Sequence, residues 1–334
     1  MPCRLFHTSE KTDNKIFHYI LWFQTSDGRL LLDEEQNKVT AFLDGRYYNK
    51  DIEGREYMVE KVLRNKKFTE LLDDYITWEE HIHIQKSLPY NVREQLSQWS
   101  TETYGSDIFV FDETYWATHI RVQKSASEIA SIQQAIQINH TLRASIQDLW
   151  DHIIGMTELD VRGMLIQQAM SLGASDEAFD TIVASGAHTA IPHHRSSRTV
   201  IEPWPLLIDM WWVVDGYCSD MTRSMRIGDD IDPEYQQILD LTMQAHDVAT
   251  EMSVSGVGFA DIARAAREVI EQGGYGEYFT HSLWHGVGLD IHEAPSVSTR
   301  STDTIQQGMV YTIEPGIYLP DRFGVRWENI VIVQ

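Results

Sequence analysis

Residues 206–223, LLIDMWWVVDGYCSDMTR, constrain the fold more than any other stretch of the chain. Two apolar runs flank Asp215-Gly216, a dipeptide typical of a two-residue β-hairpin turn. A turn there aligns Asp209 with Thr222. Asp220 then lies on the same face as Asp209, diagonally offset, because side chains alternate along a strand. We therefore expect a hairpin that carries two carboxylates on one face.

Two carboxylates this close repel each other unless a positive group lies between them. A divalent cation is one candidate for that group, and Arg223 in a salt bridge is another. A third interpretation, in which Asp209 faces solvent and Asp220 is an ordinary acid at a strand edge, needs neither. The hairpin alone leaves all three interpretations open.

Histidines gather in residues 281–295, HSLWHGVGLDIHEAP. His281, His285 and His292 are spaced by Gly286 and Gly288, whose missing side chains let the backbone approach a site closely. The stretch is not a His-Glu-x-x-His zinc helix, because its last His-Glu pair is followed by Ala-Pro. Three histidines at this spacing indicate a site more strongly than a single buried histidine would.

Two further acids lie near the end of the chain. Glu314 stands in an apolar strand, MVYTIEPG, where a lone carboxylate is costly to bury and needs a partner. In residues 324–333, GVRWENIVIV, Arg326 and Glu328 point to the same side of a predicted strand. A local salt bridge between Arg326 and Glu328 is the simplest alternative to a site.

Together these candidates form an oxygen-rich ligand set that suits Mn²⁺, Co²⁺ or Zn²⁺ better than a thiolate-seeking metal. The set comprises four carboxylates and one imidazole, namely Asp209, Asp220, His285, Glu314 and Glu328. Four carboxylates would over-neutralise a single ion. Two bridged ions about 3.5–4 Å apart balance the charge and activate a shared water.

Length and patterning indicate two domains in the 334 residues, with the boundary near residue 122. Before it, strand-like runs at residues 29–33, 39–44 and 107–112 alternate with polar stretches such as residues 57–74, for which we expect a helix. After it, a long amphipathic helix is expected over residues 127–153.

The second domain contains a weak internal repeat. Gly155, Asp160 and Gly173 recur 101 residues later as Gly256, Asp261 and Gly274, and each set frames a short helix. Thr157 and Asp160 are spaced for a helix-starting capping arrangement. We expect two similar halves, each with paired helices and a sheet, although three matched positions also arise by chance.

Charge and composition exclude several classes of protein. The chain has 27 Lys and Arg against 50 Asp and Glu, a net charge of −23 that disfavours nucleic acid as a partner. No apolar run spans a bilayer, and MPCRLFHTSEKTDNK lacks the apolar core of a secretory signal. With only Cys3 and Cys218, we expect a soluble cytoplasmic protein without membrane partners or a disulfide framework.

The candidate residues, in this order and spacing, resemble the pita-bread metallopeptidases, in the branch of Xaa-Pro aminopeptidases (aminopeptidase P) and prolidases. The resemblance covers nearly the whole chain. It implies a creatinase-like α/β N-terminal domain over residues 1–122, with FLDGRY at residues 42–47 as its clearest segment. It implies an α+β pita-bread catalytic domain over residues 123–334.

The resemblance also implies roles for the site residues. The five-residue set would ligate two metal ions, most simply Mn²⁺, with Asp220 and Glu328 bridging them and Glu314 handling the proton of the attacking water. The residues implied to bind substrate and transfer protons are His193, His281, His292 and Arg326. His193 is preferred to its neighbour His194 because it directly follows Pro192.

The implied activity is hydrolysis of the bond before proline by a metal-bridging hydroxide. That bond is a tertiary amide without an N–H, which peptidases that bind this N–H handle poorly. Small peptides with proline at the second position are the expected substrates, and a homodimer is the expected assembly. Whether dipeptides or longer peptides are cut is left open.

Three positions depart from the family pattern. Trp211 stands where the family usually has glycine, on the same face as Asp209, and Trp284 replaces a glycine just before His285. Asn329 follows Glu328 where aspartate is common. Either the tryptophans fill space without consequence, or they narrow the metal pocket and impair catalysis.

Three competing functions follow from the same residues. A catalytically impaired homologue that acts as a binding protein is the main alternative to an active peptidase. A creatinase-like amidine hydrolase shares the implied fold but lacks the metal ligands, all five of which are present here. Methionine aminopeptidase shares the ligands but lacks an N-terminal domain of this kind, so it ranks lower.

Overall fold

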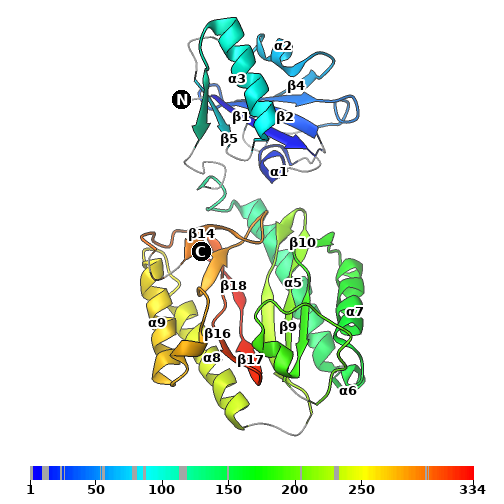
Figure 1. The fold of residues 1–334 in the computed structure, drawn as a ribbon, viewed down its shortest axis with the longest axis vertical. Coiled ribbons are helices and arrows are strands. Elements are labelled where there is room, and N and C mark those ends of the chain that lie inside the picture. The colour runs from blue at the N-terminus through cyan, green and yellow to red at the C-terminus, as the bar shows by residue number, and fades with distance from the viewer. Residues whose placement is uncertain are drawn as a thin grey trace. The chain divides into compact units, whose positions relative to one another are not determined.

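The computed structural model (Figure 1) describes residues 3–9, 15–22, 25, 27–52, 54, 57–76, 81–85, 88–112, 119–148, 150–203, 205–228, 233–297, 299 and 301–334. The chain divides into two compact units, Met1–His119 and Ile120–Gln334. Both are mixtures of helices and strands. Among the described residues, no helix is both long enough and apolar enough to cross a membrane.

The first unit is built on a six-stranded sheet in the order β4-β3-β2-β1-β5-β6. Its elements are β1 (Cys3–Ser9), α1 (Lys15–Leu21), β2 (Asp27–Asp33), β3 (Lys38–Leu43), β4 (Met58–Leu63), α2 (Phe68–Leu72), β5 (Ile82–Gln85), α3 (Tyr90–Tyr104) and β6 (Phe109–Asp112). The three strands expected at residues 29–33, 39–44 and 107–112 are confirmed as β2, β3 and β6.

The helix expected over residues 57–74 is wrong in its first half. Met58–Leu63 forms β4, which pairs in parallel with β3, and only Phe68–Leu72 is helical. The sequence pattern of the short segment MVEKVL is compatible with a helix or a strand. It forms a strand because its backbone can pair with the edge of β3.

The second unit has two halves that repeat one plan. The first half contains α5 (Ala126–Asp148), α6 (Trp150–Ile153), α7 (Glu158–Ser171), β7 (Asp176–Glu177), β8 (Ile182–Ser185), the 3₁₀ helix η1 (Gly186–Ala190), β9 (Pro205–Met210), β10 (Trp212–Val214), β11 (Tyr217–Cys218) and β12 (Met221–Arg226). Its strands form two small sheets, ordered β12-β9-β8 and β11-β10-β7. The long helix expected over residues 127–153 is confirmed as α5 and α6.

The second half contains α8 (Pro233–Glu251), α9 (Phe259–Gln272), η2 (Gly276–Tyr278), β13 (Trp284–Gly286), β14 (Glu293–Val297), β15 (Val310–Ile313), β16 (Gly316–Leu319), β17 (Phe323–Arg326) and β18 (Asn329–Ile332). Its main sheet has the order β14-β13-β15-β18, and β16 pairs with β17. Within this unit, α8 and α9 flank the strands on one side and α5 to α7 on the other (Figure 1).

The glycines that recur 101 residues apart donate equivalent backbone hydrogen bonds in the two halves. Gly155 N donates to Ile201 O, and Gly256 N donates to Ile305 O, both at 2.9 Å. Gly155, Gly173, Gly256 and Gly274 all have positive φ, between 88° and 104°, which only glycine adopts at little cost. The glycines thus recur because the same two turns bracket α7 and α9. The expected capping box between Thr157 and Asp160 is confirmed at the start of α7.

The hairpin over residues 206–223 has the predicted register. Val214 pairs with Tyr217, and Thr222 pairs with Asp209. Asp215 and Gly216 have φ of 49° and 82°, the two positive angles of the expected hairpin turn. The strands are interrupted next to Trp211, so β9 and β12 belong to a different sheet from β10 and β11.

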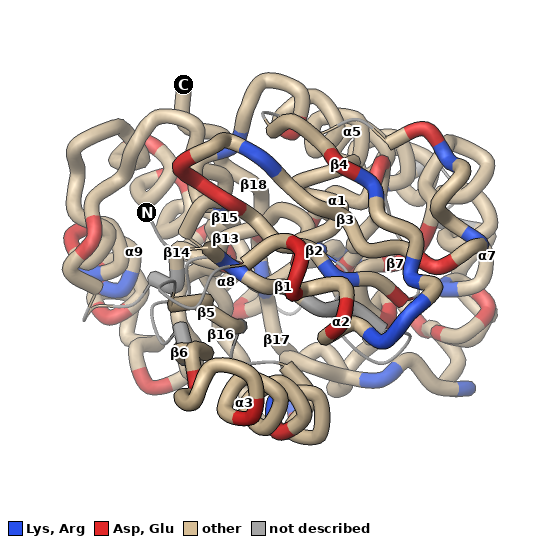
Figure 2. Tube along the Cα trace, turned by 90° about the horizontal axis from the view of Figure 1, so that it is seen from above, with Lys and Arg blue, Asp and Glu red and all other residues tan. Residues whose placement is uncertain are grey.

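Acidic residues are distributed over both units. Figure 2 shows Asp and Glu positions on α3 in the first unit and around α7 and α9 in the second. The chain as a whole has 50 acids against 27 bases, so its overall field favours the approach of cations.

Candidate metal centre

Asp220 is a buried carboxylate without a hydrogen-bond donor. It lies between β11 and β12, it is 2% exposed, and neither of its side-chain oxygens has a hydrogen-bond partner within the described residues. The hairpin register places it there, two residues before Thr222 on the inner face. A buried ionised oxygen that lacks a donor is costly, so this site requires a cation or a proton.

His285 approaches Asp220 from β13 in the other half of the unit. Its Nδ1 donates to the Gly286 carbonyl at 3.1 Å, because a carbonyl only accepts, and this leaves Nε2 free as an acceptor. Nε2 lies 3.5 Å from Asp220 Oδ2 and 3.7 Å from Glu314 Oε1. A backbone carbonyl that fixes the tautomer in this way is typical of a metal-ligating histidine.

Glu328 completes the group from the segment between β17 and β18. Its Oε2 accepts a hydrogen bond from Thr222 Oγ1 at 2.5 Å. Asp220, His285 and Glu328 each offer one ligand atom, and these atoms all lie within 4.8 Å of one another. Four of the five predicted ligands therefore converge, since Glu314 is adjacent to His285. Both halves of the unit contribute to the group.

Burial and mutual repulsion shift the protonation equilibria of this group. Burial, followed by the negative charges of Glu328 and Asp209, raises the pKa of Asp220 well above its usual value. Burial and the charge of Glu328 raise the pKa of Glu314 in the same direction. Burial and Asp209 raise the pKa of Glu328 to about 7. The acids repel one another because several carboxylates lie close together in a buried site.

The donor set fits divalent metal ions. Carboxylate oxygens and one imidazole nitrogen are ligands that Mn²⁺, Co²⁺ and Zn²⁺ accept. The unpaired oxygens of Asp220 and the free Nε2 of His285 are the atoms that such an ion would contact. A bound ion would also reverse the repulsion that raises the pKa values of the carboxyl groups.

Asp209 is held differently from the other predicted ligands. Its Oδ2 accepts from Arg326 Nη2 at 2.8 Å, and its Oδ1 accepts from the indole Nε1 of Trp211. The positive group beside the hairpin acids is therefore Arg326, whereas Arg223 hydrogen-bonds the Thr222 and Glu328 carbonyls. The interpretation with a solvent-facing Asp209 is wrong, because Asp209 is buried. The interpretation with an Arg223 salt bridge is also wrong, because Arg223 donates to backbone carbonyls and Arg326 pairs with Asp209.

Arg326 organises a chain of hydrogen bonds through the site. Its Nε donates to Thr222 Oγ1 at 2.9 Å and its Nη1 to the Tyr318 hydroxyl at 3.0 Å. The Tyr318 hydroxyl then donates to His281 Nε2 at 3.0 Å, because His281 Nδ1 donates to the Ser282 carbonyl at 2.7 Å. Arg326 pairs with Asp209, so the local Arg326–Glu328 salt bridge is not the arrangement formed.

Sequence reasoning missed Tyr318 and the role of Thr222. Tyr318 lies in β16, whereas Glu314 directly follows the end of β15 at Ile313, and the two strands belong to different sheets. Thr222 was aligned with Asp209 but was not considered as a hydrogen-bonding residue. The hairpin register indicated that Thr222 lies beside Asp209, but no local spacing rule indicated Tyr318.

The remaining predicted site residues lie close to the group. The His292 ring meets the His285 ring edge to face with centroids 4.3 Å apart, and it meets the Trp211 ring at 5.8 Å. Burial lowers the pKa of His281 to about 4, and burial and the charge of His193 lower that of His292. His193 thus lies within electrostatic reach of both, and His281 is neutral at pH 7.

The two tryptophans occupy opposite environments. Trp211 is stacked on Phe179, with centroids 4.7 Å apart, and contacts Asp209 inside the site. Trp284 points the other way, into the core beside Phe259 and Tyr311. The expectation that an indole crowds the metal pocket therefore concerns Trp211, while Trp284 fills core space.

Glu293 and the neighbouring glycines have structural roles. Glu293 forms a buried ion pair with Lys124 at 2.9 Å. A Cβ on Gly286 would lie 2.4 Å from the Ala294 carbonyl oxygen, and one on Gly288 would lie 2.4 Å from Glu293 Oε1. The glycines therefore allow close packing of β13 against β14, and their proximity to the site is a consequence of that packing.

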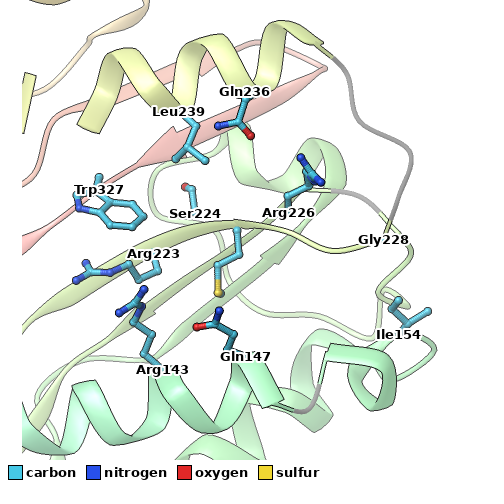
Figure 3. A pocket seen from close by; sticks show the side chains of 11 residues that line it. Arg143, Gln147, Ile154, Arg223, Ser224, Arg226, Gly228, Gln236, Leu239 and Trp327 are labelled. Carbon is cyan, nitrogen blue, oxygen red and sulfur yellow. The ribbon is translucent and has the colours of Figure 1, made fainter. Parts of the chain in front are cut away.

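A separate pocket lies beside the outer face of β12 (Figure 3). It has a volume of about 580 Å³ and is lined by Arg143 and Gln147 of α5, Arg223 and Arg226 of β12, and Trp327 among others. None of the predicted site residues lines it. In this pocket, the Arg223 guanidinium lies 4.4 Å from the centroid of the Trp327 ring and donates to the Glu328 carbonyl. Arg223 therefore fixes the backbone of a proposed metal ligand.

The fold and the site together define a mixed α/β protein with a buried centre suited to divalent metal. The model of metallopeptidase family M24 matches residues 130–334. The chain belongs to this family, in its pita-bread branch of prolidases and Xaa-Pro aminopeptidases. The predicted family resemblance is thereby confirmed.

Relatives and solved structures agree with this assignment. A Xaa-Pro dipeptidase from Pyrococcus horikoshii is 33% identical over 310 residues, which cover 92% of this chain and 84% of that protein. A putative Xaa-Pro aminopeptidase from Mycoplasma pneumoniae is 29% identical over 333 residues, 95% and 86% of the two chains.

Two solved structures are similar over the whole chain. The X-Pro aminopeptidase from Thermotoga maritima has a TM-score of 0.86 at 29% identity and covers 100% of this chain and 93% of that one. The prolidase from Pyrococcus furiosus has a TM-score of 0.83 at 28% identity, with coverages of 100% and 94%.

Proposed function

We propose that this protein is a dinuclear metal-dependent exopeptidase that hydrolyses the Xaa-Pro bond at the N-terminus of peptides or in Xaa-Pro dipeptides. The observation that carries the proposal is the buried group of Asp220, His285 and Glu328, whose ligand atoms lie within 4.8 Å of one another. The relatives named as Xaa-Pro dipeptidase, prolidase and Xaa-Pro aminopeptidase support the choice of substrate.

The proposed ligands of two divalent ions, most simply Mn²⁺, are Asp209, Asp220, His285, Glu314 and Glu328. When bound, such ions supply a Lewis acid and a water acidic enough to be deprotonated at neutral pH. Asp220 and Glu328, which come from different halves of the unit, would both help to hold the ions. Asp209 would also become a ligand if a metal ion replaced one of its present hydrogen-bond donors, Trp211 or Arg326.

In this proposal, residues of the protein itself would move protons and orient the peptide. Glu314 Oε1 lies 3.7 Å from His285 Nε2, so its carboxylate would be close enough to the proposed metal site to accept a proton from water and return it to the leaving nitrogen. His281 is held by Tyr318 and Ser282 in one tautomer. His292 and His193 remain available to donate to the oxygen of the scissile carbonyl as it becomes negative.

Proline at the second position would be compatible with this site because of the chemistry of the bond. The amide nitrogen before proline carries no hydrogen, so recognition cannot use an N–H donor at that position. A site that acts on the carbonyl and on the leaving nitrogen, as this arrangement of acids and imidazoles does, requires no such donor.

Mass-spectrometric product analysis tests the proposal. Mn²⁺-loaded protein is incubated with Xaa-Pro dipeptides, Xaa-Pro-Zaa tripeptides and proline-free controls. We expect only the proline peptides to be cut, with no cleavage by Asp220→Asn. Asp215→Asn is the matched control, because it makes the same change at the tip of the same hairpin and asparagine tolerates the positive φ of 49° there.

Cleavage of the proline-free controls at a similar rate would refute the substrate assignment. The ratio of dipeptide to tripeptide cleavage decides between prolidase and aminopeptidase P.

A catalytically impaired binding protein is the second candidate, and two contacts of Asp209 favour it. Trp211 and Arg326 donate to both oxygens of Asp209 and so compete with metal for that ligand. An impaired homologue would bind Xaa-Pro peptides in calorimetry without releasing products. The peptidase predicts product release under the same conditions.

The domain organisation, the location, the assembly and the partners of the chain are also proposals. We propose that residues 1–122 form a creatinase-like N-terminal domain, that the chain is a cytoplasmic homodimer, and that neither nucleic acid nor membrane is a partner. Light scattering coupled to gel filtration measures the oligomeric state, and a monomer at micromolar concentration would contradict the dimer.

A further inference from the structure

A second group of metal-ligating side chains lies outside the centre described above. Glu158, the first residue of α7, has a fully buried side chain. Its Oε1 contacts His188 Nδ1 at 2.8 Å and its Oε2 contacts His194 Nε2 at 2.9 Å. The proposed peptidase mechanism uses none of these three residues.

We propose that Glu158, His188 and His194 form a separate binding site for one transition-metal ion of the Zn²⁺ type. Their ligand atoms all lie within 4.8 Å of one another. Two imidazoles and one carboxylate, with water in the fourth position, form a ligand set that zinc accepts. Two nitrogen donors also make this group softer than the carboxylate-rich centre around Asp220.

The Glu158 carboxylate is already oriented by donors that a metal would not displace. The Ser185 backbone N–H donates to Oε1 at 2.9 Å, and the Ser197 N–H and hydroxyl donate to Oε2 at 2.9 and 2.8 Å. Metal-ligating carboxylates are commonly held by such outer hydrogen bonds. Although burial opposes it, hydrogen bonds from His194 and His188 lower the pKa of Glu158 to about 2, so it is ionised.

The two imidazoles present their nitrogens to the same carboxylate. Their rings are stacked, with centroids 4.2 Å apart and an interplanar angle of 26°. A neutral histidine carries its proton on either nitrogen, so moving that proton to the far nitrogen frees His188 Nδ1 or His194 Nε2 to ligate. Metal binding would therefore replace the two hydrogen bonds that these nitrogens now make to Glu158.

An ion can reach the group from solvent. The His188 side chain is 34% exposed, and His188 lines a cavity of about 580 Å³ together with Ser185 and Gly186. This cavity also supplies water for the open coordination position. The net charge of −23 favours the approach of a cation.

The site would connect a loop of the peptidase centre to α7. His188 and His194 bracket residues 189–193, which include His193 of the proposed substrate site. Arg326 Nη1 donates to the Pro192 carbonyl at 3.2 Å, so the loop already contacts the centre. An ion held by Glu158, His188 and His194 would fix both ends of this loop.

Metal counting in a chain that lacks the peptidase centre tests the proposal. The background is Asp220→Asn/His285→Ala, which removes two proposed ligands of that centre. The protein is loaded with Zn²⁺, desalted and analysed by inductively coupled plasma mass spectrometry. Co²⁺ is the second probe, since its visible absorption reports coordination geometry.

We expect the background to retain one zinc ion per chain and to melt at a higher temperature with Zn²⁺ than without it. Adding His188→Ala/His194→Ala should remove that ion, weaken Zn²⁺ affinity by roughly 10-fold or more and abolish the melting shift. His152→Ala, which removes an exposed histidine of α6, is the matched control and should retain the ion.

Two results would overturn the proposal. One is a folded background that retains no zinc. The other is equal zinc retention with and without His188 and His194. If the background fails to fold, the same pair of histidine changes is made in the otherwise unaltered chain, where the zinc content must fall by one ion. Because the readout is metal content, failure here is distinguishable from failure of the proposed peptidase activity.

Discussion

The groups around Asp220 and Glu158 contain the same residue types in opposite electrostatic settings. Around Asp220, acids gather with few hydrogen-bond donors, and burial with the charge of Asp209 raises the pKa of Glu328 to about 7. Around Glu158, five hydrogen bonds converge on one acid, whose pKa is lowered to about 2. The supply of donors, and not burial alone, decides whether a buried carboxylate stays ionised.

The two groups also differ in their effect on the stability of the metal-free fold. Buried acids that repel one another destabilise the fold unless a cation binds between them. A buried acid with five donors contributes to stability before any ion arrives. The first arrangement is typical of a functional centre that depends on metal, and the second keeps a loop in place with or without one.

The largest expected effect comes from removing metal from the Asp220 group. Chelation with EDTA should lower Xaa-Pro cleavage by ~10³-fold or more, since the ions supply several kcal/mol of transition-state stabilisation. Mn²⁺ should restore the activity, measured by product release. Full activity after exhaustive chelation would contradict the proposed mechanism.

The two groups should respond with opposite sign when an acid is neutralised in the metal-free protein. Glu158→Gln should lower the free energy of unfolding by about 3 kcal/mol, because charge-assisted hydrogen bonds are lost. Asp220→Asn should raise it by about 1 kcal/mol, because a repelled buried charge is removed. Urea denaturation measures both, and changes of the same sign would remove the distinction between the groups.

Substitution of Trp211 tests whether removing a hydrogen-bond donor from Asp209 strengthens metal binding. Trp211→Gly should free Asp209 Oδ1 for metal and raise Mn²⁺ affinity about 10-fold, a difference of about 1.4 kcal/mol. Calorimetric titration with Mn²⁺ measures this. Trp284→Phe is the control, because Trp284 lies in the core, and it should lower stability by about 1–3 kcal/mol without changing metal affinity.

The smallest effect is in the pH dependence of stability of the metal-free protein. Glu328 has its pKa raised from 4.5 to about 7, so its contribution is complete below pH 4.5 and is lost as the pH rises through 7. Glu158 has its pKa lowered from 4.5 to about 2, so its contribution is present above pH 4.5 and is lost as the pH falls through 2.

Melting temperatures measured from pH 2 to 8 separate these contributions. Glu328→Gln should flatten only the decline between pH 4.5 and 7, and Glu158→Gln only the decline between pH 4.5 and 2. An unchanged profile in either variant would show that the assigned residue does not cause that decline.

Part of the fold followed from local rules in the sequence. The Asp215-Gly216 turn set the hairpin register, and the Thr157–Asp160 spacing set a helix start, because both depend on neighbouring residues only. The helix expected over residues 57–74 failed in its first half, where pairing with β3 formed a strand. Edge pairing of this kind depends on a distant strand and leaves no local signal.

Part of the site was also predictable. Strand parity placed Asp209 and Trp211 on one face, and their side chains are in contact. The contact between Arg326 and Asp209 joins residues 117 positions apart, so no spacing rule indicated it. His188 and His194 were present in the sequence as single histidines, and nothing local connected them to Glu158, 30 and 36 residues away.

The sequence by itself determined which side chains can bind metal, the hairpin that carries Asp209 and Asp220, and the repeated glycine turns that bracket α7 and α9. These features depend on residue chemistry and on backbone angles over a few residues. The tertiary structure decided which acids share donors and which repel one another. That outcome depends on distances between segments of both halves, and those distances are set by the packing of the whole unit.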